Sequence, residues 1–236
     1  MKGIPRRGFL ILGMAALMLV TPVRIRAWRL DQSTLNSVPL SFPLHLAARD
    51  SSADFEQDGL PEALTLKNGK AVIATGIRSR WQSPQTWRVE QALITDLNRD
   101  GIPEATLLVW RPFTSWPVDA WLPHGGRISD FHDSTGMSCH IILIGWKQGA
   151  YRELWAGSAM ANPVKSFMAA DLMGDGRQYL VTLEGEYEDP WSAPARRLKV
   201  WEWNGFGFSV VNELDGSFDL IGTARIENRQ VLLLSP

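Results

Sequence analysis

The stretch ITDLNRDGIPEATLLV, residues 94–109, places an acidic, turn-forming loop between two runs of strand-forming residues. Two other stretches share this layout: ADFEQDGLPEALTL at 53–66 and ADLMGDGRQYLVTL at 170–183. Each has a short apolar approach, an Asp-x-x-x-Asp-Gly loop and a departing strand. The recurrence of such a unit along one chain indicates a repeat architecture.

Beyond residue 28 the chain is rich in short β-branched and aromatic runs bounded by Gly, Asn, Asp or Pro, and helical periodicity is hard to find. Three connections carry hairpin signals: KNGK at 67–70, KQGA at 147–150 and WNGFG at 203–207. The last contains the Asn-Gly pair typical of a tight primed turn. We therefore predict an all-β chain whose strands are largely antiparallel.

Each repeat consists of a strand, an acidic loop and three further strands, which is the content of a four-stranded antiparallel propeller blade. The larger spacing between the second and third repeats is assigned to an insertion at about 111–139. Residues 217–234 supply half of a fourth unit, and residues 28–48 are expected to complete it, which would pair the first and last parts of the chain. The predicted fold is a β-propeller-like array of three to four four-stranded antiparallel blades with acidic calcium-type loops. An open array, or completion by a partner chain, remains an alternative.

The acidic loops have the composition of a calcium site. Ca²⁺ prefers several oxygen ligands, and a tight loop with a glycine turns alternate residues towards one point. In the second loop the expected ligands are Asp96, Asn98, Asp100, the carbonyl of Ile102, and Glu104. In the first loop they are Asp54, Glu56, Asp58, the carbonyl of Leu60, and Glu62. The third loop has Met173 and Tyr179 at ligand positions, so we expect it to keep the turn without the metal. The alternative is that all three loops are turns stabilised only by their Asp and Asn side chains.

These loops resemble the FG-GAP or VCBS-type repeats, the calcium-loop blades of integrin alpha-subunit propellers and of many exported bacterial proteins. The resemblance runs from about residue 41 to the end and is interrupted by the insertion. It implies a propeller with structural Ca²⁺ and a role in adhesion or interaction, without naming the ligand.

The insertion is a rival site, because it gathers side chains that favour zinc or copper. These side chains are His124, His132, Met137, Cys139 and His140. Their spacing matches no zinc pattern, and neighbours such as Cys139 and His140 point to opposite faces of a strand. We expect a polar loop with a buried Cys139.

Aromatic residues gather where the insertion begins: Trp110, Phe113, Trp116 and Trp121. They would form either a platform for sugar or protein or, as we favour, the packing of the insertion onto its blade. Trp201 and Trp203, two residues apart on one strand, are expected to pack between blades.

The N-terminus reads as a targeting segment, because Lys2, Arg6 and Arg7 precede an uncharged apolar run from Gly8 to Val20. The string PRRGFLIL resembles a twin-arginine export signal. We assign residues 1–27 to an export signal or an N-terminal membrane anchor, and residues 28–236 to the propeller domain. The protein is expected to be extracytoplasmic, and to contact the membrane only through an uncleaved N-terminal segment.

Charge and motifs set the expected function. With 24 Lys and Arg against 25 Asp and Glu, the composition does not favour nucleic acid as a partner. Nucleophile elbows, paired catalytic acids and phosphate loops are not found in the sequence. The expected function is an exported, non-catalytic binding or scaffold module with structural Ca²⁺, acting on an unknown protein or glycan ligand. The alternatives are an extracytoplasmic metalloprotein or enzyme that uses the insertion, and a carbohydrate-binding module.

Overall fold

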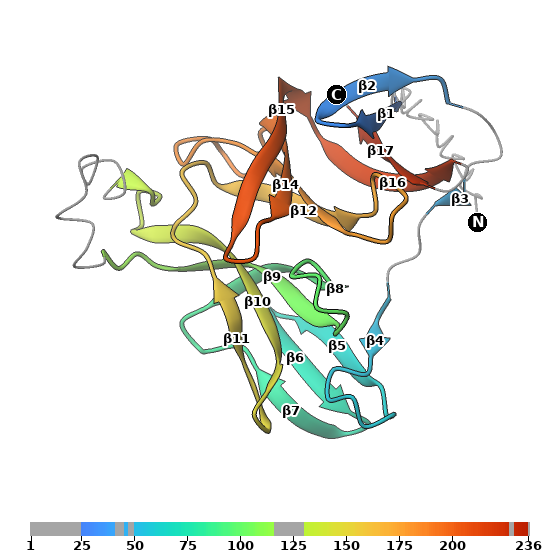
Figure 1. The fold of residues 1–236 in the computed structure, drawn as a ribbon. Helices are drawn as coiled ribbons and strands as arrows, with labels where there is room; N and C mark the ends of the chain where they lie inside the picture. The colour runs from blue at the N-terminus through green and yellow to red at the C-terminus, as the bar shows by residue number, and fades with distance from the viewer. Residues whose placement is uncertain (1–24, 41–44, 47–49, 116–129, 227–228, 236) are drawn as a thin grey trace, which may run out of the picture.

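The computed structural model describes residues 25–40, 45–46, 50–115, 130–226 and 229–235. The secondary structure of these residues is dominated by β-strands, which form four antiparallel sheets arranged as the blades of a four-bladed β-propeller (Figure 1). The prediction of an all-β propeller array is confirmed. In the described part of the chain, no helix is long and apolar enough to cross a membrane.

Each blade follows the predicted order of strand, loop and three strands. Blade one contains β4 (Ser52–Ala53), β5 (Glu62–Lys67), β6 (Lys70–Thr75) and β7 (Arg78–Gln82). Blade two contains β8 (Arg88–Thr95), β9 (Glu104–Pro112), β10 (Met137–Lys147) and β11 (Ala150–Ala156). Blade three contains β12 (Val164–Ala170), β13 (Tyr179–Glu184), β14 (Ala195–Trp203) and β15 (Phe208–Phe218). The acidic loops join the first strand of each of these blades to its second.

Blade four is built from both ends of the propeller domain. It contains β16 (Leu220–Ile226), β17 (Arg229–Ser235), β1 (Arg26–Asp31) and β2 (Thr34–Val38), and β3 (His45–Leu46) pairs with the other edge of β16. Strand β1 lies antiparallel to β17, with Ala27 opposite Leu233. The predicted completion of this blade is confirmed.

Strand β1 begins at Arg26, so Arg26 and the buried Ala27 belong to the sheet. The sequence analysis assigned both residues to the N-terminal segment. Residues 1–24 lie outside the described residues.

The core lies between neighbouring blades, and β9 and β10 of blade two and β13 of blade three are buried on both faces. All nine residues of β9 except the last two are buried, and so are all six of β13. Phe167 and Leu97 are fully buried between blades two and three. Trp155 of β11 packs edge-on against Phe208, with ring centroids 5.0 Å apart, and against Trp203 at 6.2 Å. The predicted packing of Trp203 between blades is confirmed.

All three hairpin signals join neighbouring strands, but their turns differ. Asn68 and Gly69 both have positive φ, 51° and 71°, as a two-residue primed turn requires. The tight turn predicted at Asn204-Gly205 is wrong. Trp203 pairs with Phe208, so the loop holds four residues. The Asn204 Oδ1 accepts hydrogen bonds from two backbone N–H groups of that loop, and it thereby stabilises a wider turn.

The insertion is shorter than the predicted 111–139. Strand β9 continues to Pro112 and β10 starts at Met137, and Cys139 lies opposite Trp110 in the ladder. Pairing therefore extends the blade into both ends of the segment, and the connection covers residues 113–136. Residues 116–129, which include Trp116, Trp121 and His124, lie outside the described residues.

Candidate functional site

The second acidic loop is ordered by its own polar side chains. The Asp96 Oδ1 accepts from the N–H of Gly101 at 3.4 Å, and the Asp100 Oδ1 accepts from the N–H of Ile102 at 2.9 Å. Asn98 and Asp100 also hydrogen-bond each other, at 3.0 Å. The turn predicted from Asp and Gly is confirmed. These bonds place the oxygens of Asp96, Asn98 and Asp100 on one short loop, which is compatible with a calcium site and does not require one.

Glu104 closes this loop from inside the blade. Its side chain is 0% exposed, and its Oε1 accepts from the Thr95 hydroxyl at 2.6 Å and from the Leu97 N–H at 2.7 Å. Its second oxygen, Oε2, is buried without a hydrogen-bond partner among the described residues. Burial raises the pKa of Glu104 to about 8, and the negative charges of Asp96 and Asp100 add to the rise. A buried carboxylate beside two further acids is costly on its own and would be stabilised by a cation. The charge of the second loop therefore favours a cation, although no three His, Cys, Asp or Glu side chains of the described residues are placed to hold one.

The first acidic loop fits Ca²⁺ less well. Both Glu62 oxygens are engaged, one by the Phe55 N–H at 3.0 Å and the other by the Thr75 hydroxyl at 3.3 Å. Glu56 forms an ion pair with Arg80 of β7, and this hydrogen bond lowers the pKa of Glu56. Two of the predicted ligands, Glu56 and Glu62, thus already have protein partners. Asp54 accepts from the N–H groups of Asp58 and Gly59 and holds the turn.

The third acidic loop keeps the turn, as predicted. Asp171 accepts from three backbone N–H groups of its loop at 2.7–3.1 Å. Tyr179, at the place of Glu104, is buried, and the Arg99 guanidinium of the second loop lies 5.3 Å from its ring centre.

Glutamines join neighbouring loops across the blades. Gln178 accepts from the Asp96 N–H at 2.8 Å, and Gln230 accepts from the Asp171 N–H, also at 2.8 Å. Because each glutamine comes from the following blade, these bonds fix the second and third acidic loops against the blade that follows. In the first and second repeats, Pro61 and Pro103 stand where Gln178 stands in the third.

The described histidines and the cysteine of the insertion do not converge on one point. The His140 Nδ1 donates to the Gly157 carbonyl at 3.0 Å, and its Nε2 lies 2.7 Å from the Ser138 hydroxyl. Burial lowers the pKa of His140 to about 4, so the ring is neutral with both nitrogens engaged. Cys139 is buried on the other face of β10, and burial raises the pKa of its thiol to about 12. His124 lies outside the described residues, and within them no group of three His, Cys, Asp or Glu side chains is placed to hold a metal.

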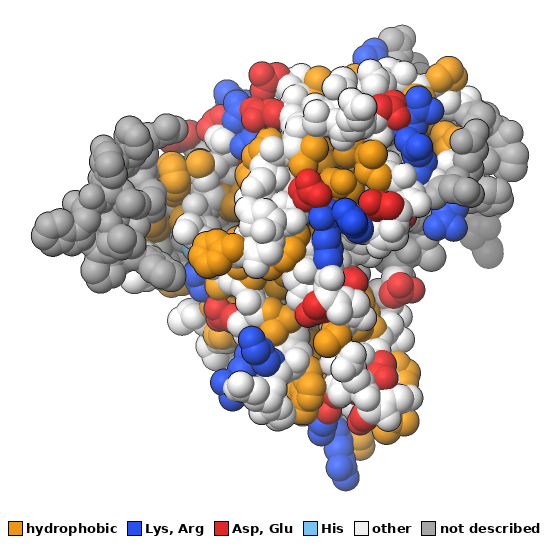
Figure 2. Space-filling view, viewed as in Figure 1, with side chains coloured by type: hydrophobic (Ala, Val, Ile, Leu, Met, Phe, Trp, Pro, Cys, Tyr) orange, Lys and Arg blue, Asp and Glu red, His pale blue; other side chains and the backbone are white. Residues whose placement is uncertain are grey.

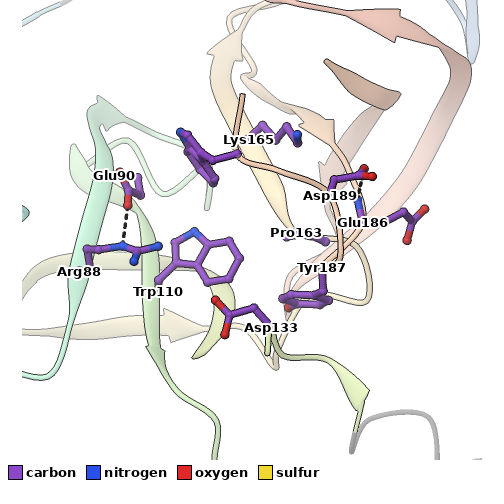
Figure 3. A pocket seen from close by; sticks show the side chains of 10 residues that line it. Arg88, Glu90, Trp110, Asp133, Pro163, Lys165, Glu186, Tyr187 and Asp189 are labelled. Atoms are coloured by element: carbon purple, nitrogen blue, oxygen red, sulfur yellow. Dashed lines mark hydrogen bonds and ion pairs between the residues drawn. The ribbon is translucent and has the colours of Figure 1, made fainter. Parts of the chain in front are cut away.

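A cleft of about 420 Å³ lies between blades two and three (Figure 3). It falls within the about 300–1,000 Å³ typical of ligand pockets. Blade two supplies one wall and blade three, with the 185–194 loop between β13 and β14, supplies the other. The residues that line this cleft are Arg88, Glu90, Trp110, Asp133, Pro163, Lys165, Glu186, Tyr187, Asp189 and Trp191.

Most of the charges in the cleft are already paired. Arg88 forms an ion pair with Glu90 at 2.6 Å, and Asp189 forms one with Arg196, whose hydrogen bond lowers the Asp189 pKa. Lys165 donates to the backbone carbonyls of Pro190 and Ala193. The polar groups are therefore held in place before a ligand arrives.

Aromatic rings form the apolar part of the cleft. Trp110 is only 4% exposed and meets Tyr187 edge-on at 5.8 Å and Trp191 at 6.1 Å between ring centroids. The Arg88 guanidinium lies 5.4 Å from the Trp110 ring centre. Trp191, by contrast, is 51% exposed. The cleft thus contains one half-exposed indole ring next to charged groups that already have partners.

The sequence analysis missed this cleft. Its lining comes from strands far apart in the chain, which only the pairing of the blades brings together. One local signal was present: the string GEYEDPWSAP at 185–194 combines aromatic, acidic and proline residues between two strands.

Comparison of the chain with protein-family models, with curated proteins and with solved structures gives no significant match. The fold and the side-chain geometry are the remaining basis for assigning a function.

Proposed function

We propose that this protein is an extracytoplasmic, non-catalytic binding module, a propeller of the FG-GAP or VCBS type that binds its ligand in the cleft between blades two and three. The cleft carries the proposal. It combines a half-exposed tryptophan with polar groups that the protein already holds in fixed positions, which is how ligand sites achieve affinity at low ordering cost. On the face of the molecule seen in Figure 2, acidic and basic side chains are intermixed. This mixture supports a ligand other than nucleic acid.

Binding through the cleft is tested with arrays of glycans and peptides. The purified protein and its Trp191→Ala variant are applied in parallel, and we expect at least one class of ligand to bind in a Trp191-dependent way. A matched control is Phe206→Ala, because Phe206 is 90% exposed on the hairpin between β14 and β15 and does not line the cleft. Binding that is equal in all three proteins would contradict the cleft as the ligand site.

The second part of the proposal is a structural Ca²⁺ in the second acidic loop. Asp96, Asn98, Asp100 and Glu104 would supply side-chain oxygens and Ile102 its carbonyl. The buried, unpartnered oxygen of Glu104 supports this assignment. Calcium in the first loop remains a prediction. When bound, the ion would neutralise the crowded acids and fix the loop between β8 and β9.

Thermal unfolding with and without a chelator tests the calcium. We expect added Ca²⁺ to raise the Tm of the wild-type protein and the Asp96→Ala/Asp100→Ala variant to lose most of that gain. Asp175→Ala is the matched control, since Asp175 holds the turn of the third loop. If neither Ca²⁺ nor EDTA changes the Tm of the wild-type protein, the calcium site is refuted.

Export is tested by substituting Arg6 and Arg7 with lysine in the full chain. If the twin-arginine route carries the protein, the variant should accumulate inside the cytoplasm. A variant that is exported as efficiently as the wild type would argue for another route.

A further inference from the structure

A second hollow shares Trp191 with the cleft. This hollow, about 200 Å³, lies beside the end of β15 and the 185–194 loop, and Leu183, Pro194, Phe218 and Asp219 contribute to its wall. Trp191 and Lys165 line both hollows. Both hollows therefore border Trp191, and we call the pair the groove.

The loop that carries Trp191 is held rigidly. The Lys165 ammonium donates to the Pro190 carbonyl at 3.1 Å and to the Ala193 carbonyl at 2.6 Å, so it ties the chain on both sides of Trp191. Asp189 accepts from the Glu186 N–H at 3.0 Å, which closes the preceding turn. A rigid, exposed indole between two hollows is suited to stacking against a flat, partly apolar ligand ring.

The charges of the groove select among elongated ligands. Four carboxylates and two cations line the larger hollow, so a polyanion would meet net negative charge. A basic peptide would have to compete with Arg88 for Glu90 and with Arg196 for Asp189. A neutral polyhydroxylated ligand disturbs neither pair, since carboxylates and guanidinium groups in an ion pair retain further positions for hydrogen bonds to hydroxyl groups.

We propose that this groove binds a neutral oligosaccharide, with one sugar ring stacked on Trp191 and the neighbouring units in the two hollows. The assignment rests on the proposed binding function and names its ligand class. Glu90 and Asp133 line the larger hollow and Asp219 lines the smaller one, and their carboxylates would accept hydrogen bonds from sugar hydroxyls, while Arg88 would donate one. Because the chain of sugars spans both hollows, binding should strengthen from one unit to several.

Isothermal titration with the full protein tests the proposal. The probes are cellohexaose, chitohexaose and xylohexaose, each beside its monosaccharide, together with heparin as a polyanion and oligolysine as a basic peptide. We expect at least one neutral hexasaccharide to bind more tightly than its monosaccharide. Trp191→Ala should weaken that binding about tenfold or more, because a stacked aromatic anchor carries much of the energy of such a contact. Trp191→Phe should retain part of it, and Phe206→Ala should bind like the wild type.

Four results would overturn the proposal, and they separate the ligand class from the function. Trp191-dependent binding of oligolysine or heparin alone would leave the cleft as a binding site and refute the neutral glycan. Neutral glycan binding that survives Trp191→Ala would refute the groove. If none of the probes binds, the neutral oligosaccharide is refuted as the ligand class. The arrays of glycans and peptides would then decide whether the cleft binds a ligand of another class. Shortening of a hexasaccharide during incubation would refute the non-catalytic function.

Discussion

Replacing Glu104 with glutamine should stabilise the calcium-free protein at neutral pH. The Glu104 Oε1 accepts two hydrogen bonds, while Oε2 is buried without a partner among the described residues. A glutamine can keep the accepting oxygen in place of Oε1 and put an amide nitrogen in place of the unpartnered Oε2. The change removes the need to bind a proton on folding at neutral pH, and it leaves the volume of the side chain nearly unchanged.

The size of the expected gain in the free energy of unfolding follows from the pKa of Glu104. Burial raises it from 4.5 to about 8, so the folded state binds this proton more tightly than the unfolded state. The resulting stabilisation is fully present below the unfolded pKa and is lost as pH rises towards the folded pKa. From pH 4.5 to pH 7 the loss covers about 2.5 pH units at about 1.36 kcal/mol each, or roughly 3.4 kcal/mol.

The assay is thermal unfolding of both proteins in EDTA at pH 5 and pH 7. At pH 7 the Tm of Glu104→Gln should exceed that of the wild type by about 7–14 °C for a domain of this size. At pH 5 the two should nearly coincide. Saturating Ca²⁺ should narrow or reverse the difference at pH 7, because a ligand at 100 times its Kd stabilises the wild type by about 2.7 kcal/mol. A Tm difference that is the same at both pH values would refute the reasoning.

Three further predictions concern the core. Cys139 should resist a thiol reagent in the folded protein at pH 8, since its burial raises the thiol pKa to about 12; rapid labelling in native buffer would contradict this. Lys199→Met leaves the buried Glu184 carboxylate without the ammonium group that lies 2.8 Å away, and urea unfolding should show a loss of about 3–5 kcal/mol. Phe167→Ala opens a cavity at a fully buried side chain and should cost about 3–5 kcal/mol, whereas the exposed Phe206→Ala should cost almost nothing in the same measurement.

Much of the fold could be predicted from local features of the sequence. The acidic loops and the Asn68-Gly69 turn depend on residues a few positions apart, so their conformations are encoded where they occur. The fourth blade was also predictable. Residues 217–234 form only half a repeat, and its strands need further strands to pair with. The turn at Asn204 differed from the predicted two-residue turn because the Asn204 amide side chain accepts hydrogen bonds from the loop backbone. Composition alone does not distinguish such a loop from a two-residue turn.

The cleft was less accessible to sequence reasoning for a physical reason. Arg88 and Trp191 are brought together by the packing of two blades, and neither lies in a motif. The sequence analysis placed the alternative of a binding platform in the insertion, and it favoured packing of those aromatic residues onto the blade. Trp110, one of that aromatic group, proves to be buried behind Trp191. Which tryptophan of a cluster remains open to solvent depends on how neighbouring blades close over the others.

The pairing of β1 with β17 has a consequence for how the molecule is made. The two strands are about 200 residues apart, so at roughly 5–20 residues per second β1 waits about 10–40 s for its partner during synthesis. Until β17 emerges, β16 and β1 each expose an unpaired strand edge, which invites association with other chains. Contacts between such distant segments also form slowly. The fourth blade is therefore completed only after β17 has been made, and a chain that loses β17 should aggregate rather than persist as a three-bladed protein.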